Sequence, residues 1–200
     1  MAIVSDSDGN GEMSPQDEAL WLGARTLADL GELTAEWLEG RVKAQPRYFG
    51  GPDPETGPLA PVLAACNRAG FVTDDSQPGE PRDEYEPQRA AVCGYMATEA
   101  LSRLCRYLAG TGLAVVAHAP ARQITSDDAA IVITPSDEEY YTRTGGPMSA
   151  ATLRSEYAGS LHPDAIEALC AAWQVSIVDL EWGRNDVLWP ALGRFAAASR

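Results

Sequence analysis

The residues best suited to bind a small molecule form two short polar groups on either side of one apolar stretch. Glu55-Thr56 precedes a run with helical spacing, and Thr73 and Ser76 follow a short apolar strand. A helix N-terminus and the carboxyl end of a strand both present unpaired backbone groups, so the space between them is a usual place for a small ligand. Hydroxyl groups can donate and accept hydrogen bonds, and a carboxylate can pair with a cation. The pattern therefore indicates a candidate binding site.

A structural role for the same residues is the alternative interpretation. Glu55 or Thr56 would cap the helix that follows, and Ser76 would begin a turn. On spacing alone, this second interpretation is the stronger of the two.

Familiar catalytic motifs are absent from the sequence. There is no GxGxxG, GxxxxGK[ST], HExxH or GxSxG pattern, so the common phosphate cradles, the zincin helix and the nucleophile elbow are excluded. His118 ends an apolar strand and His162 precedes a proline, which favours structural roles for both. Neighbouring acids occur at 74–75, 127–128 and 138–139. Such pairs are usually solvated loop residues rather than catalytic carboxylates or Mg²⁺ ligands.

Length and charge narrow the possible partners. The chain has 200 residues, enough for one medium domain, and its net charge is −14. This field repels phosphate backbones and anionic lipid headgroups, so we expect no nucleic acid and no membrane as partner. The N-terminus carries acids where a signal peptide needs bases, and no apolar run approaches a bilayer span of about 20 residues. We expect a cytoplasmic protein.

Cysteine and histidine usage predicts no metal site. The four cysteines are scattered without a CxxC pair, and only two histidines could join them. We expect the cysteines to be reduced thiols in the core.

Helical and strand patterns alternate along the chain. Thr26 and Asp29 form a capping box for a helix that Gly40 ends. Further helices are expected at 58–70, 98–110, from 149, from 164 and from 185 or 186, and strands at 71–73, 89–97, 113–119, 129–134 and 175–180. The segment 74–87 is expected to be an acidic loop. The interleaving predicts an α/β (mixed α+β) fold, with residues 1–16 as a flexible acidic leader and residues 17–200 as a single domain.

The two polar groups, together with the turn between them, also carry a family resemblance. Glu55-Thr56, the run Asn67-Arg68-Ala69-Gly70-Phe71-Val72-Thr73 and then Ser76-Gln77-Pro78 follow one another with fixed spacing. In this the sequence resembles the C-terminal regulatory domain of eukaryotic methylenetetrahydrofolate reductase. The similarity extends from Trp21 to Phe195, strongly in the first half of the chain and faintly in the middle. The high alanine and glycine content is typical of a GC-rich bacterial source.

The resemblance implies a fold of mixed β-sheets flanked by helices, and a site for S-adenosylmethionine or S-adenosylhomocysteine. It implies no reductase activity, because that chemistry needs a separate barrel of about 250 residues. Ligand contacts carried over from the family fall on Glu55, Thr56, Thr73 and Ser76, with Thr134, Thr142 and Thr144 as approximate counterparts of two further threonines.

Three functions remain open from the sequence. The first is a stand-alone sensor or regulatory module for an adenosyl ligand. The second is an acidic interaction or inhibitor module that has kept the fold but lost the ligand, and that binds a basic protein. The third is an enzyme acting on the ligand, with Asp74 or Asp75 as acid or base. Because no activated nucleophile or metal set is visible, the enzyme ranks last. Family members dimerise, so a homodimer is a further possibility.

Overall fold

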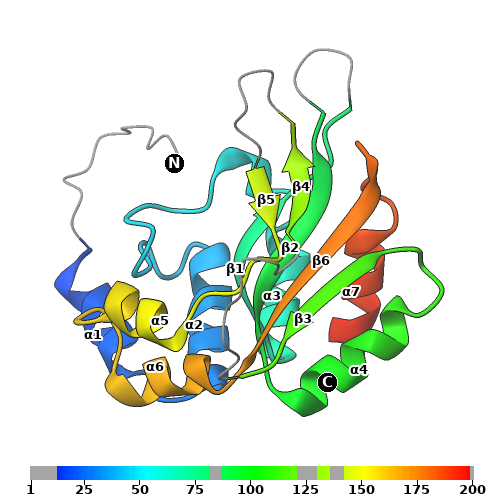
Figure 1. Cartoon of the computed structure of the whole chain (residues 1–200). Helices are drawn as coiled ribbons and strands as arrows, with labels where there is room; N and C mark the ends of the chain where they lie inside the picture. Colours follow the sequence, from blue (N-terminus) through cyan, green and yellow to red (C-terminus); the bar gives the residue numbers. More distant parts are fainter. Residues whose placement is uncertain (1–12, 82–86, 121–129, 136–141, 199–200) are drawn as a thin grey trace.

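A four-stranded antiparallel sheet with strand order β1-β2-β6-β3 forms the centre of the molecule (Figure 1). The computed structural model describes residues 13–81, 87–120, 130–135 and 142–198. The strands of this sheet are β1 (Phe71–Gln77), β2 (Arg89–Met96), β3 (Ala114–His118) and β6 (Trp173–Trp182). Because β1 and β3 are its edges, one side of β1 stays open to neighbouring loops.

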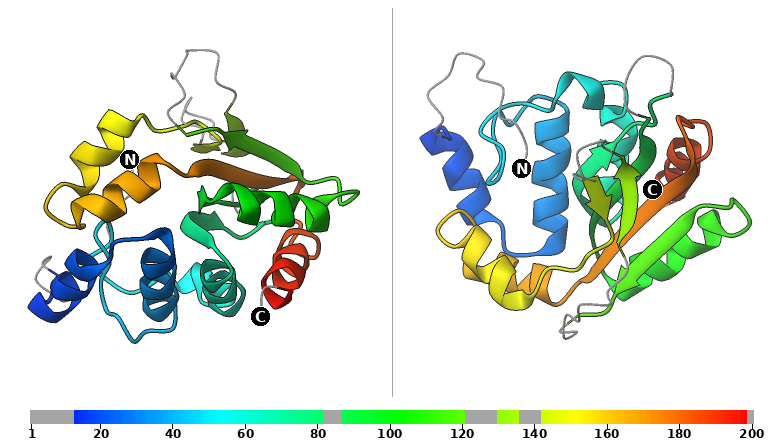
Figure 2. Two further views of the ribbon diagram at one scale, coloured as in Figure 1. Left: turned by 90° about the horizontal axis from the view of Figure 1, so that it is seen from below. Right: turned by 45° about the horizontal axis from the view of Figure 1, so that its top comes forward.

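Helices cover one face of this sheet (Figure 2). The helices of the described chain are α1 (Pro15–Gly23), α2 (Leu27–Leu38), the 3-10 helix η1 (Pro54–Thr56), α3 (Ala60–Arg68), α4 (Thr98–Leu108), α5 (Ala150–Tyr157), α6 (Pro163–Cys170) and α7 (Leu188–Ala197). Helices α2, α3, α4 and α7 lie side by side under the sheet, and the main core lies between these layers. None of the described helices is long and apolar enough to cross a bilayer.

A two-stranded sheet lies on the opposite face. Its strands are β4 (Ile131–Thr134) and β5 (Thr142–Thr144). Ile133 is buried against Ala91 of β2 and Val178 of β6 in a small cluster of their own. The mixed α+β class expected from the sequence is therefore confirmed.

Local capping signals determine where α2, a helix that borders the candidate site, begins and ends. Helix α2 begins with the expected capping box, in which Thr26 Oγ1 accepts a hydrogen bond from the backbone N–H of Asp29 and the Asp29 carboxylate accepts one from the backbone of Thr26. Gly40, just beyond the end of α2, has φ of 75°. A positive φ is unfavourable for residues with a Cβ, so glycine suits this stop.

Three expectations differ from the structure. Helix α1 begins at Pro15, so the last two residues of the expected leader are helical; residues 1–12 lie outside the described chain. Neither Asn185 nor Asp186 caps α7, and Asn185 instead makes two hydrogen bonds to the backbone of Gly79. Strand β1 continues to Gln77 where an acidic loop was expected. Pairing with β2 stabilises it despite the low strand propensity of its acids.

Candidate functional site

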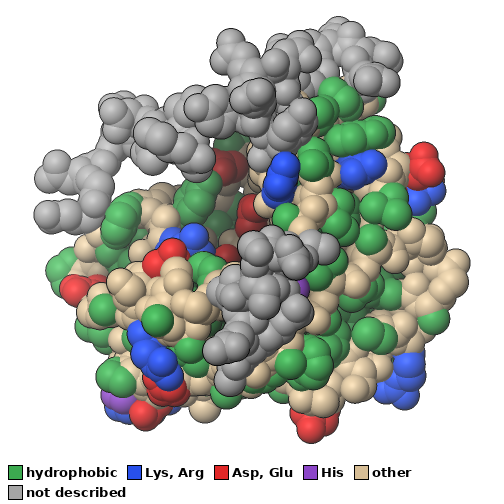
Figure 3. Space-filling model, in the orientation of Figure 1, with side chains coloured by type: hydrophobic (Ala, Val, Ile, Leu, Met, Phe, Trp, Pro, Cys, Tyr) green, Lys and Arg blue, Asp and Glu red, His purple; other side chains and the backbone are tan. Residues whose placement is uncertain are grey.

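A pocket lies against the outer edge of β1, enclosed by the segment 45–56 and by α2 and α3. Its lining residues are Trp37, Leu38, Gln45, Tyr48, Asp53, Glu55, Thr56, Leu63, Thr73, Asp74, Asp75, Ser76 and Gln77. Figure 3 shows acidic side chains gathered in a hollow of this face. The enclosed cavity measures about 70 Å³, and the wider hollow, including solvent at its mouth, about 520 Å³.

Four of the seven predicted site residues line this pocket together. Glu55 and Thr56 come from η1, and Thr73 and Ser76 come from β1. The structural alternative proposed from spacing is wrong in its details. The N-cap residue of α3 is Leu59, no side chain caps that helix, and Ser76 lies within a strand rather than at a turn.

The three remaining threonines lie elsewhere. Thr134 and Thr142 are paired across β4 and β5, and Thr134 Oγ1 donates to Gln88 Oε1 at 3.1 Å. Thr144 Oγ1 donates to Ser176 Oγ of β6 at 3.2 Å. None of the three lines the pocket. The hydroxyl group of Thr144 joins the small sheet to β6, and that of Thr134 joins it to the residue just before β2.

Asn67 holds Thr73 in place at the pocket wall. The side chain of Asn67 is buried, with 2% exposed. Its Nδ2 donates to the carbonyl oxygen of Leu63 at 2.9 Å and to Thr73 Oγ1 at 2.7 Å, and its Oδ1 accepts from the backbone N–H of Thr73 at 3.0 Å. The resemblance marked Asn67 only as part of a turn, so its role in orienting Thr73 was missed from the sequence.

An irregularity in β1 shapes the same wall. The register with β2 shifts between Thr73 and Asp75, which pair with Gly94 and Cys93. Such a bulge inserts an extra residue, here Asp74, and redirects the side chains that follow it. Glycine is required opposite the bulge, since a Cβ on Gly94 would lie 2.1 Å from the carbonyl oxygen of Val72.

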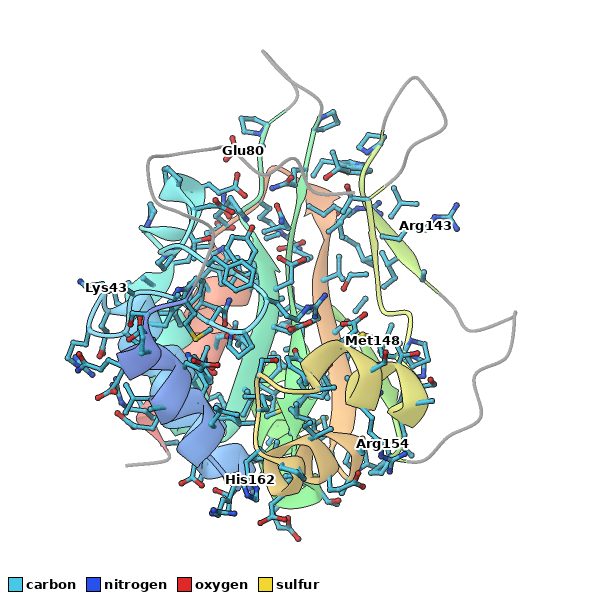
Figure 4. The ribbon with its side chains drawn as sticks, turned by 90° about the vertical axis from the view of Figure 1, so that its left-hand side faces the viewer. Lys43, Glu80, Arg143, Met148, Arg154 and His162 are labelled. Carbon is cyan, nitrogen blue, oxygen red and sulfur yellow. The ribbon has the colours of Figure 1, made fainter. Side chains whose placement is uncertain are left out.

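Carboxylates crowd the mouth of the pocket. The pKa of Glu55 is raised because partial burial and the nearby charges of Asp53, Glu80 and Asp75 disfavour its ionised form. Figure 4 faces this side and labels Glu80, beyond the end of β1. The pKa of Asp75 is raised by loss of hydration and by the neighbouring Asp74, although the residue remains exposed. A cation bound here would relieve this repulsion.

Aromatic rings complete the wall. Tyr48 meets Trp37 edge to face, with ring centroids 6.1 Å apart. Tyr48 Oη donates to Asp53 at 2.8 Å, and this bond, with burial, raises the pKa of Tyr48 to about 12. Ring faces beside carboxylates attract cations. The pocket therefore combines cation-attracting groups with the hydroxyl groups of Thr56, Thr73 and Ser76.

Among the described residues, Asp74 differs from the other pocket carboxylates because it forms an ion pair with an arginine. Both of its carboxylate oxygens accept hydrogen bonds from Arg47, and Oδ1 also accepts one from Tyr157 Oη at 3.3 Å. A carboxylate held in this way is poorly suited to act as a general acid or base.

Other sequence candidates have structural roles in the described chain. His118 is buried, with Nε2 2.6 Å from the carbonyl oxygen of Gly145, and His162 is the N-cap residue of α6. The acid pairs at 127–128 and 138–139 lie outside the described residues. Among the described residues, no three His, Cys, Asp or Glu side chains gather as a metal site would require. The cysteines are free thiols, but of the four only Cys66 is buried; Cys93 and Cys170 are partly buried, and Cys105 is exposed.

Comparison with known proteins gives one family match. The sequence model of the family described as "Domain of unknown function (DUF6919)" matches residues 16–199. No curated protein matches the chain.

Proposed function

We propose a function for this chain, which belongs to the DUF6919 family of domains of unknown function, from the chemistry of its pocket. The chain is a binding module for S-adenosylmethionine, acting as a sensor or regulatory domain. S-adenosylhomocysteine binds at the same place but more weakly. The cellular location that we propose is the cytoplasm, as expected from the sequence.

One observation carries this proposal. Glu55 and Thr56 of η1 share a pocket with Thr73 and Ser76 of β1, and these are the residues that the family resemblance relates to ligand contacts. A structural role in capping or turn formation would not require the four side chains to meet.

Charge supports the sulfonium form of the ligand. S-adenosylmethionine carries a sulfonium and an ammonium group against one carboxylate, so its net charge is positive. Glu55 and Asp75 offer carboxylates that form no ion pair with an arginine of the described residues, unlike Asp74. Trp37 and Tyr48 offer aromatic rings. S-adenosylhomocysteine lacks the sulfonium charge and loses this attraction.

Size limits how the ligand fits. The enclosed cavity of about 70 Å³ is well below the roughly 150 Å³ of an engineered cavity that holds benzene. Only one end of an adenosyl ligand is enclosed, and the rest lies along the open mouth. The acidic and aromatic lining favours the cationic amino-acid end inside.

Calorimetric titration with both ligands tests the proposal. We expect S-adenosylmethionine to bind, and to bind about tenfold more tightly than S-adenosylhomocysteine, a difference of about 1.4 kcal/mol. A micromolar ligand at millimolar concentration stabilises the fold by about 4 kcal/mol, so thermal unfolding provides a second readout. If neither ligand binds nor raises the melting temperature, the proposed function is wrong. Equal affinities for the two ligands would contradict only the expected preference for the sulfonium charge, not the binding function.

The same samples distinguish the other two functions. Chromatography of S-adenosylmethionine after incubation with the protein would reveal breakdown products if the chain were an enzyme. Ligand-independent retention of a basic protein would indicate an interaction module. We expect the nucleoside to be recovered intact.

A further inference from the structure

The hydrogen bonds around Asn67 determine the orientation of its amide group. A backbone N–H can only donate and a backbone carbonyl can only accept. Because the backbone N–H of Thr73 points at one end of the amide, that end is the oxygen; because the carbonyl of Leu63 faces the other end, that end is the nitrogen. The amide nitrogen must then donate to Thr73 Oγ1, which acts as acceptor in this bond.

The hydroxyl proton of Thr73 is left for another acceptor. Thr73 Oγ1 accepts from Asn67 and cannot also donate to it, and no hydrogen bond within the described residues uses that proton. Thr73 lines the pocket. We propose that Asn67 is a positioning residue that makes the Thr73 hydroxyl a hydrogen-bond donor toward the pocket, and that the ligand atom bound there is an acceptor oxygen.

This inference rests on the proposed function and deepens it by assigning the chemistry of one contact. Thr73 comes from a wall otherwise rich in carboxylates, which only accept hydrogen bonds when ionised. The Thr73 hydroxyl offers a hydrogen-bond donor at this point of the wall. The carboxylate or a ribose hydroxyl of an adenosyl amino acid can bind there without meeting another negative group. The acidic residues then select the cationic groups, and the Asn67–Thr73 pair selects an oxygen acceptor.

The substitution Asn67→Asp tests the polarity of the hydroxyl. An ionised Asp still accepts from the backbone N–H of Thr73 but cannot donate, so the hydroxyl turns to donate to it and presents only lone pairs to the pocket. We expect the affinity for S-adenosylmethionine to fall about tenfold, the size of one hydrogen bond. Lowering the pH protonates the new carboxyl and restores a hydrogen-bond donor. The loss of affinity relative to wild type should therefore become smaller.

A double-mutant cycle shows whether Asn67 acts through Thr73. Thr73→Ser keeps the hydroxyl and should bind nearly as wild type, whereas Thr73→Val should lose about tenfold. In the Thr73→Val background, Asn67→Asp should cause no further loss of affinity. A further loss of the same size would overturn the inference, since Asn67 would then act by another route.

A ligand-free measurement separates this inference from the proposed function. In protein with isotope-labelled asparagine, nuclear magnetic resonance follows the two Asn67 amide protons. Thr73→Val should shift one of them strongly and speed its exchange with solvent, and Thr73→Ser should not. If the wild-type protein binds no adenosyl ligand, the proposed function fails. The resonance measurement still shows whether the Asn67 amide donates a hydrogen bond to the Thr73 hydroxyl. If Thr73→Val leaves both signals unchanged, the inference fails even where S-adenosylmethionine binds.

Discussion

Arg47 and Asp74 are joined side by side at the edge of the pocket. Arg47 Nη1 lies 3.1 Å from Oδ1 and 3.0 Å from Oδ2 of Asp74, which connects the segment 45–56 to β1. On the other side, Arg47 Nε lies 3.6 Å from the carboxylate of Glu156 in α5. One guanidinium thus holds three parts of the chain together and compensates the charge of the residue inserted by the bulge.

Replacing this arginine should affect the two ligands unequally. In Arg47→Leu, the segment 45–56 loses its tie to β1, so we expect weaker binding of both ligands. The charge of Asp74 is then uncompensated, so S-adenosylmethionine should lose less affinity than S-adenosylhomocysteine. The free energy of unfolding should fall by only about 0.2–1 kcal/mol, because the pair is partly exposed. Calorimetric titration of wild type and Arg47→Leu with both ligands measures the loss of affinity for each.

Arg154→Leu is the matched control for that change. Arg154 forms a comparable ion pair with Glu167, at 2.6 Å, between α5 and α6. Figure 4 shows Arg154 at the lower end of this face, far from Glu80. Its loss should leave both affinities unchanged. An equal effect of the two substitutions would argue against a specific role for Arg47.

Removing single pocket charges should selectively weaken the cationic ligand. In Glu55→Gln and Asp75→Asn the shape of the side chain is kept, so only the attraction to the sulfonium and ammonium groups is lost. A loss of about 1 kcal/mol each, or roughly fivefold in affinity, is the scale for solvated charge pairs. S-adenosylhomocysteine should lose less in calorimetric titrations. Glu167→Gln, outside the pocket, serves as the charge control, and equal losses for both ligands would contradict the prediction.

The raised pKa values of Glu55 and Asp75 predict a pH dependence with a definite sign. Both carboxyls bind protons more readily in the folded chain than at their ordinary pKa values of 4.5 and 3.8. Their contribution to the free energy of unfolding therefore falls as pH rises above those values. A bound cation favours the ionised forms, so stabilisation by S-adenosylmethionine should grow with pH. Thermal unfolding with and without ligand across mildly acidic pH measures this, and a shift independent of pH would contradict it.

Arg68 should stabilise the fold at neutral pH but not in strong acid. It pairs with Glu32 of α2 and with Glu39, the C-cap residue of α2. Its hydrogen bonds to Glu39 lower the pKa of that carboxyl from 4.5 to about 2. A lowered pKa contributes stability above pH 4.5 that is lost as pH falls toward about 2. In Arg68→Leu we expect a loss of about 1 kcal/mol or less at neutral pH. Urea unfolding should show the difference from wild type shrinking toward pH 2, and a constant difference would refute the assignment.

A single methyl group at Gly94 should disturb the pocket wall. In Gly94→Ala the added Cβ would lie 2.1 Å from the carbonyl oxygen of Val72 and 2.8 Å from Cα of Thr73. Because the obstacles are backbone atoms, we expect a loss of about 1–3 kcal/mol in urea unfolding. We also expect weaker ligand binding, since Thr73 must move. Gly23→Ala meets nothing within 4 Å and should change stability by less than about 0.5 kcal/mol.

Local interactions were readable from the sequence. The capping box of Thr26 and Asp29 and the stop at Gly40 depend on backbone groups within a few residues, and both occur as predicted. The strand that begins at Phe71 was also expected. Since η1 and β1 flank one short helix, the meeting of Glu55 with Ser76 could be anticipated from their order in the chain.

Contacts between distant segments could not be read in this way. The continuation of β1 through Asp75 depends on pairing with Cys93, and the carboxylate of Asp74 depends on Arg47 and Tyr157. The positions of Thr134, Thr142 and Thr144, away from the pocket, follow from how the small sheet lies on the large one.

The sequence by itself determined which residue types could bind a ligand and which helix and strand would carry them, because caps, turns and periodicity are properties of neighbouring residues. Only the tertiary structure decided which of those side chains share a pocket and which carboxylate, that of Asp74, is paired with an arginine. Those outcomes depend on strand register and on packing between segments far apart in the chain, which a local pattern does not encode.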